Sequence, residues 1–398
     1  MIKREFYLKN IRGFYDSDLV KIIAGMRRSG KSVILSQIAD ELIKKGIKES
    51  QIIDIDFESL DYAHITTALD LDKYIKNFLK TKDKYYIFLD EIQKIPDFAL
   101  AVNSLRATEN VSLFITGSSS KLFSKELPTD LSGRYVSFYI APFSFQEVFQ
   151  YVGGELPQKE EIFQKYLEWG GMPQIYNLQF KNEYSIYLSD LYNSIILKDI
   201  VERLKLKDID LLNRILQFIV ENVGQIFSAN SISKYLKSEQ LSVAPAKIYE
   251  YLAAIESSLI ISRVNRYDIR GKKIIQFYDK FYLTDLGLMQ LKKSSYEKSS
   301  GGRLENIVFN ELKIHRKEIY IGDINNKEVD FVVKDEHGLT YIQVAETLSS
   351  QSVIEREFGV FANIPDNYKK IVLSLDKINH SRDGIEHKNL IDWLLETK

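Results

Sequence analysis

The stretch GMRRSGKS, Gly25 to Ser32, stands between the apolar run LVKIIA and the amphipathic stretch VILSQIADELIKK. Its spacing is G-x-x-x-x-G-K-[ST], and these two runs predict the strand and the helix that the motif requires on either side. Gly25 and Gly30 allow backbone angles that a Cβ would resist, so that consecutive N–H groups can curl around phosphate oxygens. The alternative interpretation, a surface turn rich in glycine and serine, predicts neither flanking element. The stretch therefore predicts a phosphate-binding loop in an α/β sheet.

The last two residues of this loop predict its ligand. Lys31 can reach the β- and γ-phosphate oxygens, and the Ser32 hydroxyl is short enough to ligate a Mg²⁺ ion that bridges them. The expected cofactors are therefore ATP and Mg²⁺. Arg27 and Arg28 are expected to point outward, with contacts to another domain as one use and no catalytic role. The residues predicted to line the nucleotide are Gly25, Met26, Arg27, Arg28, Ser29, Gly30, Lys31, Ser32 and Val33.

A second motif, KYYIFLDEIQ, predicts the acidic half of the same site. Residues 85–89 form an apolar run typical of a strand buried on both faces, and it ends in Asp90 and Glu91. Ligands of parallel sheets collect at the carboxyl ends of strands, so Asp90 is expected to hold Mg²⁺, directly or through water, and Glu91 to polarise the attacking water. Alternatively, the two acids only begin the following helix, where they suit its dipole. The presence of both motifs favours the nucleotide interpretation.

Two further residues are candidates for catalysis. The apolar run of VSLFITGSSS ends in polar residues between the two motifs, and Ser118 is predicted to act there as a sensor of the γ-phosphate or of the attacking water. A helix N-cap is an equal alternative for this serine. Arg134, in LSGRY, is predicted to act as an arginine finger in its own subunit or from a neighbouring subunit. An ordinary surface arginine stays open as the alternative.

Taken in order, GMRRSGKS, FLDEIQ, ITGSSS, LSGRY and PFSFQEVF resemble the archaeal and bacterial AAA-like ATPases of the signal-transducing branch of P-loop NTPases. The resemblance spans almost the whole chain. The element GGMP (170–173) matches a Gly-x-Pro element that follows the ATPase core in such proteins, and LYNSIILKDIVERLKLKD resembles the helix that comes next. The resemblance also implies a nuclease-like domain at the carboxyl end.

The middle of the chain predicts a winged helix-turn-helix. Three stretches with helical spacing, IDLLNRILQFIVENVG, SANSISKYLK and VAPAKIYEYLAAIESS, precede two strand-like runs, LIISRVNRYD and GKKIIQFYDKFYLTD. Glu250 and Glu256 on the third helix make a poor surface for contacting base edges. DNA binding and a structural hinge that contacts the ATPase domain therefore both stay open. The expected wing is basic, with Arg263, Arg266, Arg270, Lys272 and Lys273.

At the carboxyl end, RLENIVFNELKIH predicts a helix, and KEVDFVV and TYIQVAE predict strands, an order that resembles PD-(D/E)XK nucleases. That resemblance implies carboxylates and a lysine around Mg²⁺. Glu305 and Asp330 fit the first two positions, and Glu328 lies on the same strand face as Asp330, as a metal ligand or as a solvated residue. By alternation Gln343 and Ala345 stand where the E-x-K pair belongs. This departure argues against cleavage and favours a scaffold retained for docking.

Composition excludes several other classes of protein. The chain of 398 residues has no cysteine, its five histidines show no metal-ligand spacing, and its net charge is -1, so a nucleic-acid contact requires a local patch. The amino terminus lacks the apolar core of a signal peptide, and no apolar run approaches the ~20 residues that span a bilayer. We therefore expect a soluble cytoplasmic protein with no membrane contact.

These patterns predict an α/β protein in four parts. They are a P-loop AAA-like ATPase domain with a parallel sheet and flanking helices (1–155), a helical segment (156–207), a winged helix-turn-helix (208–290) and a small α/β restriction-endonuclease-like domain (300–398). The expected function is that of an ATP hydrolase acting as a nucleotide-dependent molecular switch, which controls the last two domains and meets an unknown protein partner. The alternatives are an ATP-dependent DNA-binding and processing protein with nuclease activity, and an ATP-binding regulator that hardly hydrolyses.

Overall fold

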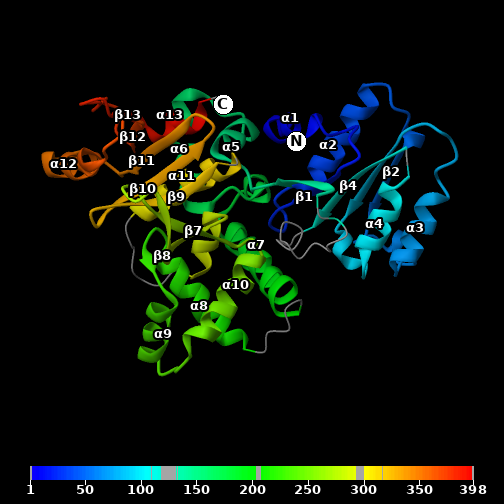
Figure 1. Cartoon of the computed structure of the whole chain (residues 1–398), viewed down its shortest axis with the longest axis horizontal. Helices are drawn as coiled ribbons and strands as arrows, with labels where there is room; N and C mark the ends of the chain where they lie inside the picture. The colour runs from blue at the N-terminus through cyan, green and yellow to red at the C-terminus, as the bar shows by residue number, and fades with distance from the viewer. Residues whose placement is uncertain are drawn as a thin grey trace. The chain divides into compact units, whose positions relative to one another are not determined.

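The computed structural model describes residues 2–108, 110–117, 131, 133–202, 208–292, 300–315 and 317–396. The chain forms two compact units (Figure 1), which are Met1–Pro142 with Ser257–Leu259, and Phe143–Glu256 with Ile260–Lys398. Each unit contains one sheet, of five strands in the first unit and eight in the second. The first unit ends earlier than the predicted boundary at residue 155, because the Phe143 N–H already donates to the Gly171 carbonyl of the second unit.

The sheet of the first unit is parallel throughout and has the order β2-β3-β4-β1-β5. Every residue of β1, β3 and β4 is buried, which explains why these strands are nearly continuous apolar runs in the sequence. The predicted α/β class with a parallel sheet is confirmed. The strands are β1 (Val20–Ala24), β2 (Ile52–Asp56), β3 (Tyr85–Asp90), β4 (Val111–Gly117) and β5 (Tyr135–Tyr139).

Helices lie on both faces of this sheet (Figure 1), and the long ones are α1 (Glu5–Arg12), α2 (Lys31–Lys44), α3 (Ala68–Lys76) and α4 (Phe98–Arg106). Side chains of α3 and α4, including Leu71 and Val102, share one buried cluster with the strands. On α2, Ile34 and Ile38 belong to its buried stripe. The sheet is thereby covered on both sides, as parallel sheets require.

In the second unit the sheet has the order β13-β12-β11-β10-β9-β7-β8-β6. The parallel pairing of β7 with β9, which sets Arg266 opposite Ile321, joins the predicted winged-helix region to the predicted nuclease-like region. The two regions therefore share one sheet, and β9 satisfies an edge of the hairpin that would otherwise be open. The strands are β6 (Ile226–Phe227), β7 (Ile261–Asp268), β8 (Lys273–Leu283), β9 (Glu318–Ile324), β10 (Lys327–Asp335), β11 (Gly338–Val344), β12 (Lys369–Ser374) and β13 (Glu386–Asn389).

The helices of the second unit include the three that were expected before the hairpin, α8, α9 and α10. The short strand β6 between α8 and α9 pairs antiparallel with β8 and was not predicted. The helices are α5 (Phe145–Tyr151), α6 (Lys159–Trp169), α7 (Lys181–Ser194), the π-helix η8 (Ile195–Glu202), α8 (Ile209–Glu221), α9 (Ala229–Ser238), α10 (Pro245–Ser257), α11 (Ser300–Ile314), α12 (Gln351–Gly359) and α13 (Leu390–Leu395).

The GGMP element is tied to the loop after β8 by one buried carboxylate. Asp285 accepts hydrogen bonds from the Gly171 N–H at 2.7 Å and from the Gly287 N–H at 2.9 Å. A Cβ on Gly170, whose φ is +75°, would lie 2.1 Å from Asp285 Oδ1, so only glycine fits there. Burial raises the pKa of Asp285 to about 6. The element is therefore a packing motif of the second unit.

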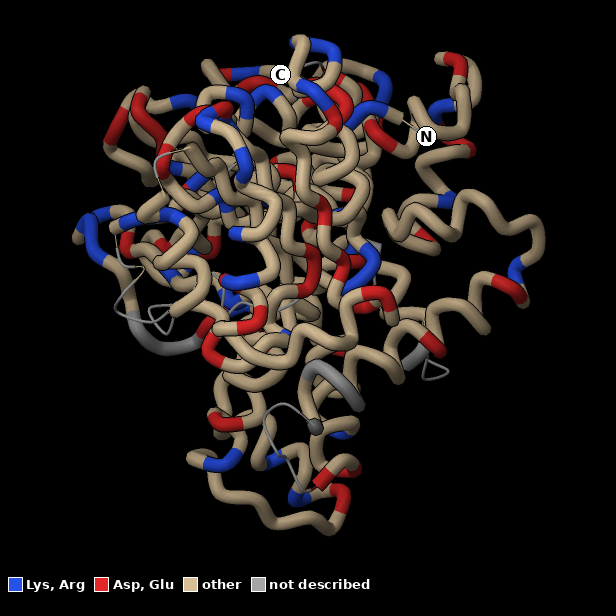
Figure 2. Tube along the Cα trace, turned by 90° about the vertical axis from the view of Figure 1, so that its right-hand side faces the viewer, with Lys and Arg blue, Asp and Glu red and all other residues tan. Residues whose placement is uncertain are grey.

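Acidic and basic residues both occur over most of the described trace (Figure 2). Residues 49–72 are an exception, because they carry seven acidic side chains and no lysine or arginine. Among the described residues, no helix combines the length and the apolar character that a membrane crossing needs.

Candidate nucleotide-binding site

The glycine-rich loop connects the carboxyl end of β1 to the first turn of α2, as the sequence predicts. Arg28 and Gly30 adopt positive φ angles of 62° and 98°, and the Ser29 N–H donates to the Met26 carbonyl at 3.2 Å. A Cβ on Gly25 would lie 2.1 Å from the Ile140 carbonyl oxygen, so the loop requires glycine at its first position as well. The Ser29 hydroxyl is buried and has no hydrogen-bond partner among the described residues. The loop is therefore tightly folded, and the Ser29 hydroxyl inside it is available to a ligand.

A buried arginine, which sequence reasoning missed, holds this loop. Arg4 is 1% exposed, and its guanidinium donates to the Ser29 carbonyl at 2.8 Å and to the Ala141 carbonyl at 3.0 Å. It also lies 4.5 Å from the centre of the Tyr7 ring. Arg4 therefore connects the loop to the segment that ends the first unit. Its sequence position gave no signal, because the two contacts lie 25 and 137 residues away along the chain.

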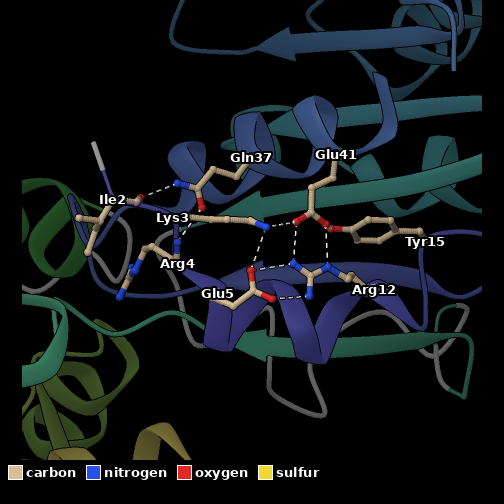
Figure 3. A network of polar contacts seen from close by, with 8 residues as sticks. All are labelled: Ile2, Lys3, Arg4, Glu5, Arg12, Tyr15, Gln37 and Glu41. Carbon is tan, nitrogen blue, oxygen red and sulfur yellow. Dashed lines mark hydrogen bonds and ion pairs between the residues drawn. The ribbon is translucent and has the colours of Figure 1, made fainter. Parts of the chain in front are cut away.

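A polar network fastens the amino-terminal segment that carries Arg4 to helix α2 (Figure 3). Glu41 of α2 receives hydrogen bonds from Arg12, at 2.6 and 2.9 Å, and from the Tyr15 hydroxyl at 2.9 Å. Gln37 accepts from the Arg4 N–H at 3.0 Å and donates to the Ile2 carbonyl at 2.8 Å. The hydrogen bonds from Arg12 lower the pKa of Glu41 to about 2. The network fixes the main chain of Arg4 relative to the helix that follows the loop.

The structure brings the loop lysine and the predicted water-polarising glutamate together. Lys31 Nζ lies 3.4 Å from Glu91 Oε1 and 3.4 Å from the Met26 carbonyl oxygen. Both side chains are largely buried, with exposures of 4% and 15%. Glu91 has a φ of 53°, a left-handed conformation that costs a residue with a Cβ about 1–3 kcal/mol. The carboxylate is thus held at the loop by a strained backbone.

Asp90 and Thr116 lie together at the carboxyl edge of the sheet. Thr116 Oγ1 donates to Asp90 Oδ1 in a short hydrogen bond and accepts from the Glu91 N–H at 2.9 Å. Thr116 is fully buried and pairs in register with Ile23 of β1, next to the loop. Sequence reasoning placed the sensor at Ser118, which lies outside the described residues. The polar end of β4 was the signal that could have identified Thr116.

The remaining predicted residues of the loop and of α2 differ in exposure and in their contacts. Ser32 lies exposed in the first turn of α2, next to the half-buried Val33. Arg27 forms an ion pair with Glu58 at 3.1 Å, in the segment that follows β2. Arg27 therefore contacts the ATPase unit itself instead of serving only another domain.

Arg134 lies at the amino edge of the sheet, whereas the glycine-rich loop lies at the carboxyl edge. It precedes β5, whose first residue pairs with Val20 at the amino end of β1, whereas Tyr139 pairs with Ala24 beside the loop. The strand separates the two ends by about 13 Å, taking about 3.3 Å per residue. A role as an arginine finger, in its own subunit or from a neighbouring subunit, stays a prediction, and this separation favours the neighbouring subunit.

The residues at this edge fit a magnesium–nucleotide complex. Mg²⁺ prefers oxygen ligands and is usually held by one or two protein groups together with substrate phosphates and water. The Ser32 hydroxyl and the Asp90 carboxylate supply such oxygens, and the unpartnered Ser29 hydroxyl lies in the cradle itself. Consistent with a site that phosphates must complete, the described part of the chain contains no group of three or more His, Asp or Glu residues that holds a metal alone.

The first unit is similar to AAA-type P-loop domains. Residues 17–149 match the family model described as "AAA domain", and residues 160–295 match a model described as "Domain of unknown function". A solved structure of the Walker-type ATPase of Pyrococcus abyssi has a TM-score of 0.51 at 16% identity, covering 73% of this chain and 96% of that chain, which supports the fold.

Over its full length the chain belongs to the same family as an uncharacterized protein of Haemophilus influenzae. The two are 35% identical over 400 residues, which cover 100% of this chain and 99% of the relative. An uncharacterized protein of Methanocaldococcus jannaschii is 29% identical over 381 residues, covering 92% of this chain and 83% of that protein.

Proposed function

We propose that the protein is a Mg²⁺-dependent ATPase that works as a nucleotide-dependent switch for the second unit. The single observation that carries this proposal is the meeting of the Lys31 ammonium and the Glu91 carboxylate, 3.4 Å apart, at the mouth of the glycine-rich loop. A lysine that binds phosphate and a glutamate that activates water act on the same γ-phosphate, so both have to lie at the same end of the loop.

In the proposed mechanism the loop N–H groups and Lys31 bind the triphosphate. Ser32 and Asp90 would hold a magnesium ion, which would supply positive charge against the phosphates. Thr116 fixes Asp90 and the Glu91 backbone through its hydroxyl. When phosphate draws Lys31 toward itself, Glu91 Oε1 loses its ion-pair partner and can accept a proton from water, while Glu91 Oε2 keeps its hydrogen bond from Gln93 Nε2. The ion pair is therefore the element whose state depends on the nucleotide.

The proposed route to the second unit starts at Arg4. This residue contacts the loop through Ser29 and the residues Ala141 and Pro142 through their carbonyl oxygens. Pro142 is followed directly by Phe143, where the second unit begins. A change in the loop on phosphate binding therefore alters hydrogen bonds to the last residues of the first unit, which favours a switch that controls the winged-helix and nuclease-like regions.

The experiment that tests this function compares ATP binding and phosphate release in the wild type and in Glu91→Gln. The variant is expected to keep ATP with near wild-type affinity, because the loop and Lys31 are intact, and to lose at least a hundredfold in kcat, because the carboxylate that accepts the proton is gone. Normal turnover in Glu91→Gln removes this glutamate from the mechanism. Binding without turnover in the wild type favours the regulator that hardly hydrolyses.

Two predicted residues await separate tests. Ser118 as a γ-phosphate sensor is tested by Ser118→Ala, which should lower kcat more than ATP affinity. Arg134 from a neighbouring subunit is tested by mixing inactive Arg134→Ala with inactive Glu91→Gln. Restored turnover in the mixture supports a shared site, because each variant supplies what the other lacks.

A second candidate function is DNA binding through the hairpin of β7 and β8. Two of its arginines already have carboxylate partners, since Arg263 Nε donates to Asp279 at 2.7 Å and Arg266 pairs with Asp323. The cations at the exposed tip favour phosphate contacts, which weaken steeply with salt. The cations at the tip are Arg270, Lys272 and Lys273. If DNA binds there, replacing these three residues with glutamine should remove binding of the protein to a labelled DNA duplex at 50 mM salt.

A further inference from the structure

A buried group of carboxylates lies where helix α11 meets strand β10 in the second unit. Glu305 and Asp330, the pair that fits the nuclease positions in the sequence, are 8% and 7% exposed. Asp330 accepts a hydrogen bond from the Val344 N–H at 2.8 Å, and Gln343 accepts from the Asp330 N–H at 3.2 Å. The Gln343 side-chain oxygen is therefore engaged with the backbone of the neighbouring strand.

The positive charge among these carboxylates comes from the chain itself. Lys280 of β8 is 1% exposed, and its Nζ lies 2.8 Å from Glu305 Oε1 and 2.5 Å from Glu328 Oε1. The Tyr282 hydroxyl donates to the same oxygen of Glu305 in a short hydrogen bond. Glu305 thus has one oxygen occupied by an ammonium and by a phenol, both from one strand.

Charges within the group counter one another. Burial alone would lower the pKa of Lys280, but the charges of Glu305, Asp330 and Glu328 raise it above its ordinary value. Burial, together with the charge of Glu305, raises the pKa of Asp330 well above its usual range. The oxygens of Glu305 and Glu328 that a metal ion would need already contact the ammonium.

We propose that Lys280 is the resident cation of this carboxylate group, that it takes the position a divalent ion would need, and that the group is a structural ion-pair centre instead of a metal-dependent nuclease site. A Mg²⁺ or Mn²⁺ ion requires oxygen ligands, and the Glu305 and Glu328 oxygens that it would need already bind the ammonium at 2.8 and 2.5 Å. The residues present therefore do not fit a divalent ion while Lys280 holds this position.

This assignment explains why the hairpin and the carboxyl-terminal region share one sheet. Lys280 belongs to the hairpin, whereas Glu305 and Glu328 belong to α11 and β10. Each ion pair therefore crosses the boundary that the sequence predicted between two domains. These ion pairs add to the pairing of β7 with β9, which already joins the two regions in one sheet.

The experiment measures Mn²⁺ uptake by full-length, nucleotide-free protein, using the loss of the free Mn²⁺ electron paramagnetic resonance signal. The wild type is expected to show the same uptake as Asp330→Asn, because no metal binds at this group. Lys280→Met is expected to gain a Mn²⁺ site, and Lys280→Met combined with Glu305→Gln is expected to lose it again. The double variant is the matched control, because it keeps the methionine and removes a ligand.

Two results overturn the proposal. If the wild type takes up Mn²⁺ and Asp330→Asn does not, a divalent ion binds despite Lys280. If Lys280→Met folds but takes up no more Mn²⁺ than the wild type, the lysine did not occupy a metal position. If Lys280→Met does not fold, the comparison of the wild type with Asp330→Asn still decides. Wild-type cleavage of plasmid with Mn²⁺ that is lost in Asp330→Asn also contradicts the proposal.

Discussion

Replacing Arg4 with glutamine tests how the loop is held in its binding form. The change removes a buried guanidinium that donates to Ser29 at 2.8 Å and to Ala141 at 3.0 Å. Hydrogen bonds from a charged donor contribute about 1.5–3 kcal/mol each, and a buried carbonyl left without a partner costs about 1–3 kcal/mol. Because glutamine can replace one of the two bonds, we expect a loss of about 2–4 kcal/mol in the free energy of unfolding.

The same change should weaken nucleotide binding. If the Ser29 contact contributes about 1.5–3 kcal/mol to the binding form of the loop, that form becomes less populated by about tenfold to a hundredfold, and the apparent Kd for Mg-ATP rises by the same factor. A titration with a fluorescent ATP analogue measures this shift. Circular dichroism at the same temperature verifies that the variant is folded.

Arg12→Gln is the matched control, because it makes the same chemical change on the same amino-terminal segment. Arg12 contacts Glu5 and Glu41 and no residue of the loop in any described hydrogen bond. It should lower stability and change the Kd by less than about threefold, since no loop contact is lost. A folded Arg4→Gln protein with a wild-type Kd, or an equal loss of affinity in Arg12→Gln, refutes the reasoning.

Two further predictions concern neighbouring residues. Thr116→Val keeps the shape of the side chain but removes the hydroxyl between Asp90 and the Glu91 N–H. In a phosphate-release assay, kcat should therefore fall about tenfold to a hundredfold, with a smaller change in KM. An unchanged kcat contradicts this role of Thr116. Glu41→Gln should cost about 1–2 kcal/mol at pH 7, after allowance for solvent screening, because hydrogen bonds from Arg12 lower the pKa of Glu41 to about 2. The stabilisation by the Glu41 carboxylate is complete above about pH 4.5 and is lost as the pH falls through 2. The free energies of unfolding of the wild type and of Glu41→Gln, measured with denaturant, should therefore become equal in acid. A difference that stays constant with pH argues against the ion pair.

The parallel sheet and the loop could be predicted because their signals are local. The run before Gly25 and the run before Asp90 each show a buried strand, and the glycine spacing carries its own backbone requirement. The meeting of Lys31 with Glu91 follows from one rule, that the carboxyl ends of parallel strands share an edge. The same rule predicts that Arg134, which precedes a parallel strand, lies at the opposite edge of the sheet from the loop.

The contacts made by side chains from distant segments could not be predicted. Arg4 reaches the loop and the segment after β5, and Lys280 reaches a helix and a strand that come later in the chain. A lysine in a strand and an arginine near the amino terminus look like ordinary exposed cations in a sequence. Only the fold places them where burial and neighbouring oxygens determine what they do.

The most direct test of the central claim is calorimetry of Mg-ATP binding to the wild type and to Lys31→Ala. The wild type should release or absorb measurable heat with a stoichiometry near one nucleotide per chain. Lys31→Ala should give none at the same concentrations while it unfolds at a similar temperature. No heat from the wild type, or undiminished binding by Lys31→Ala, contradicts the assignment of the loop as a nucleotide site.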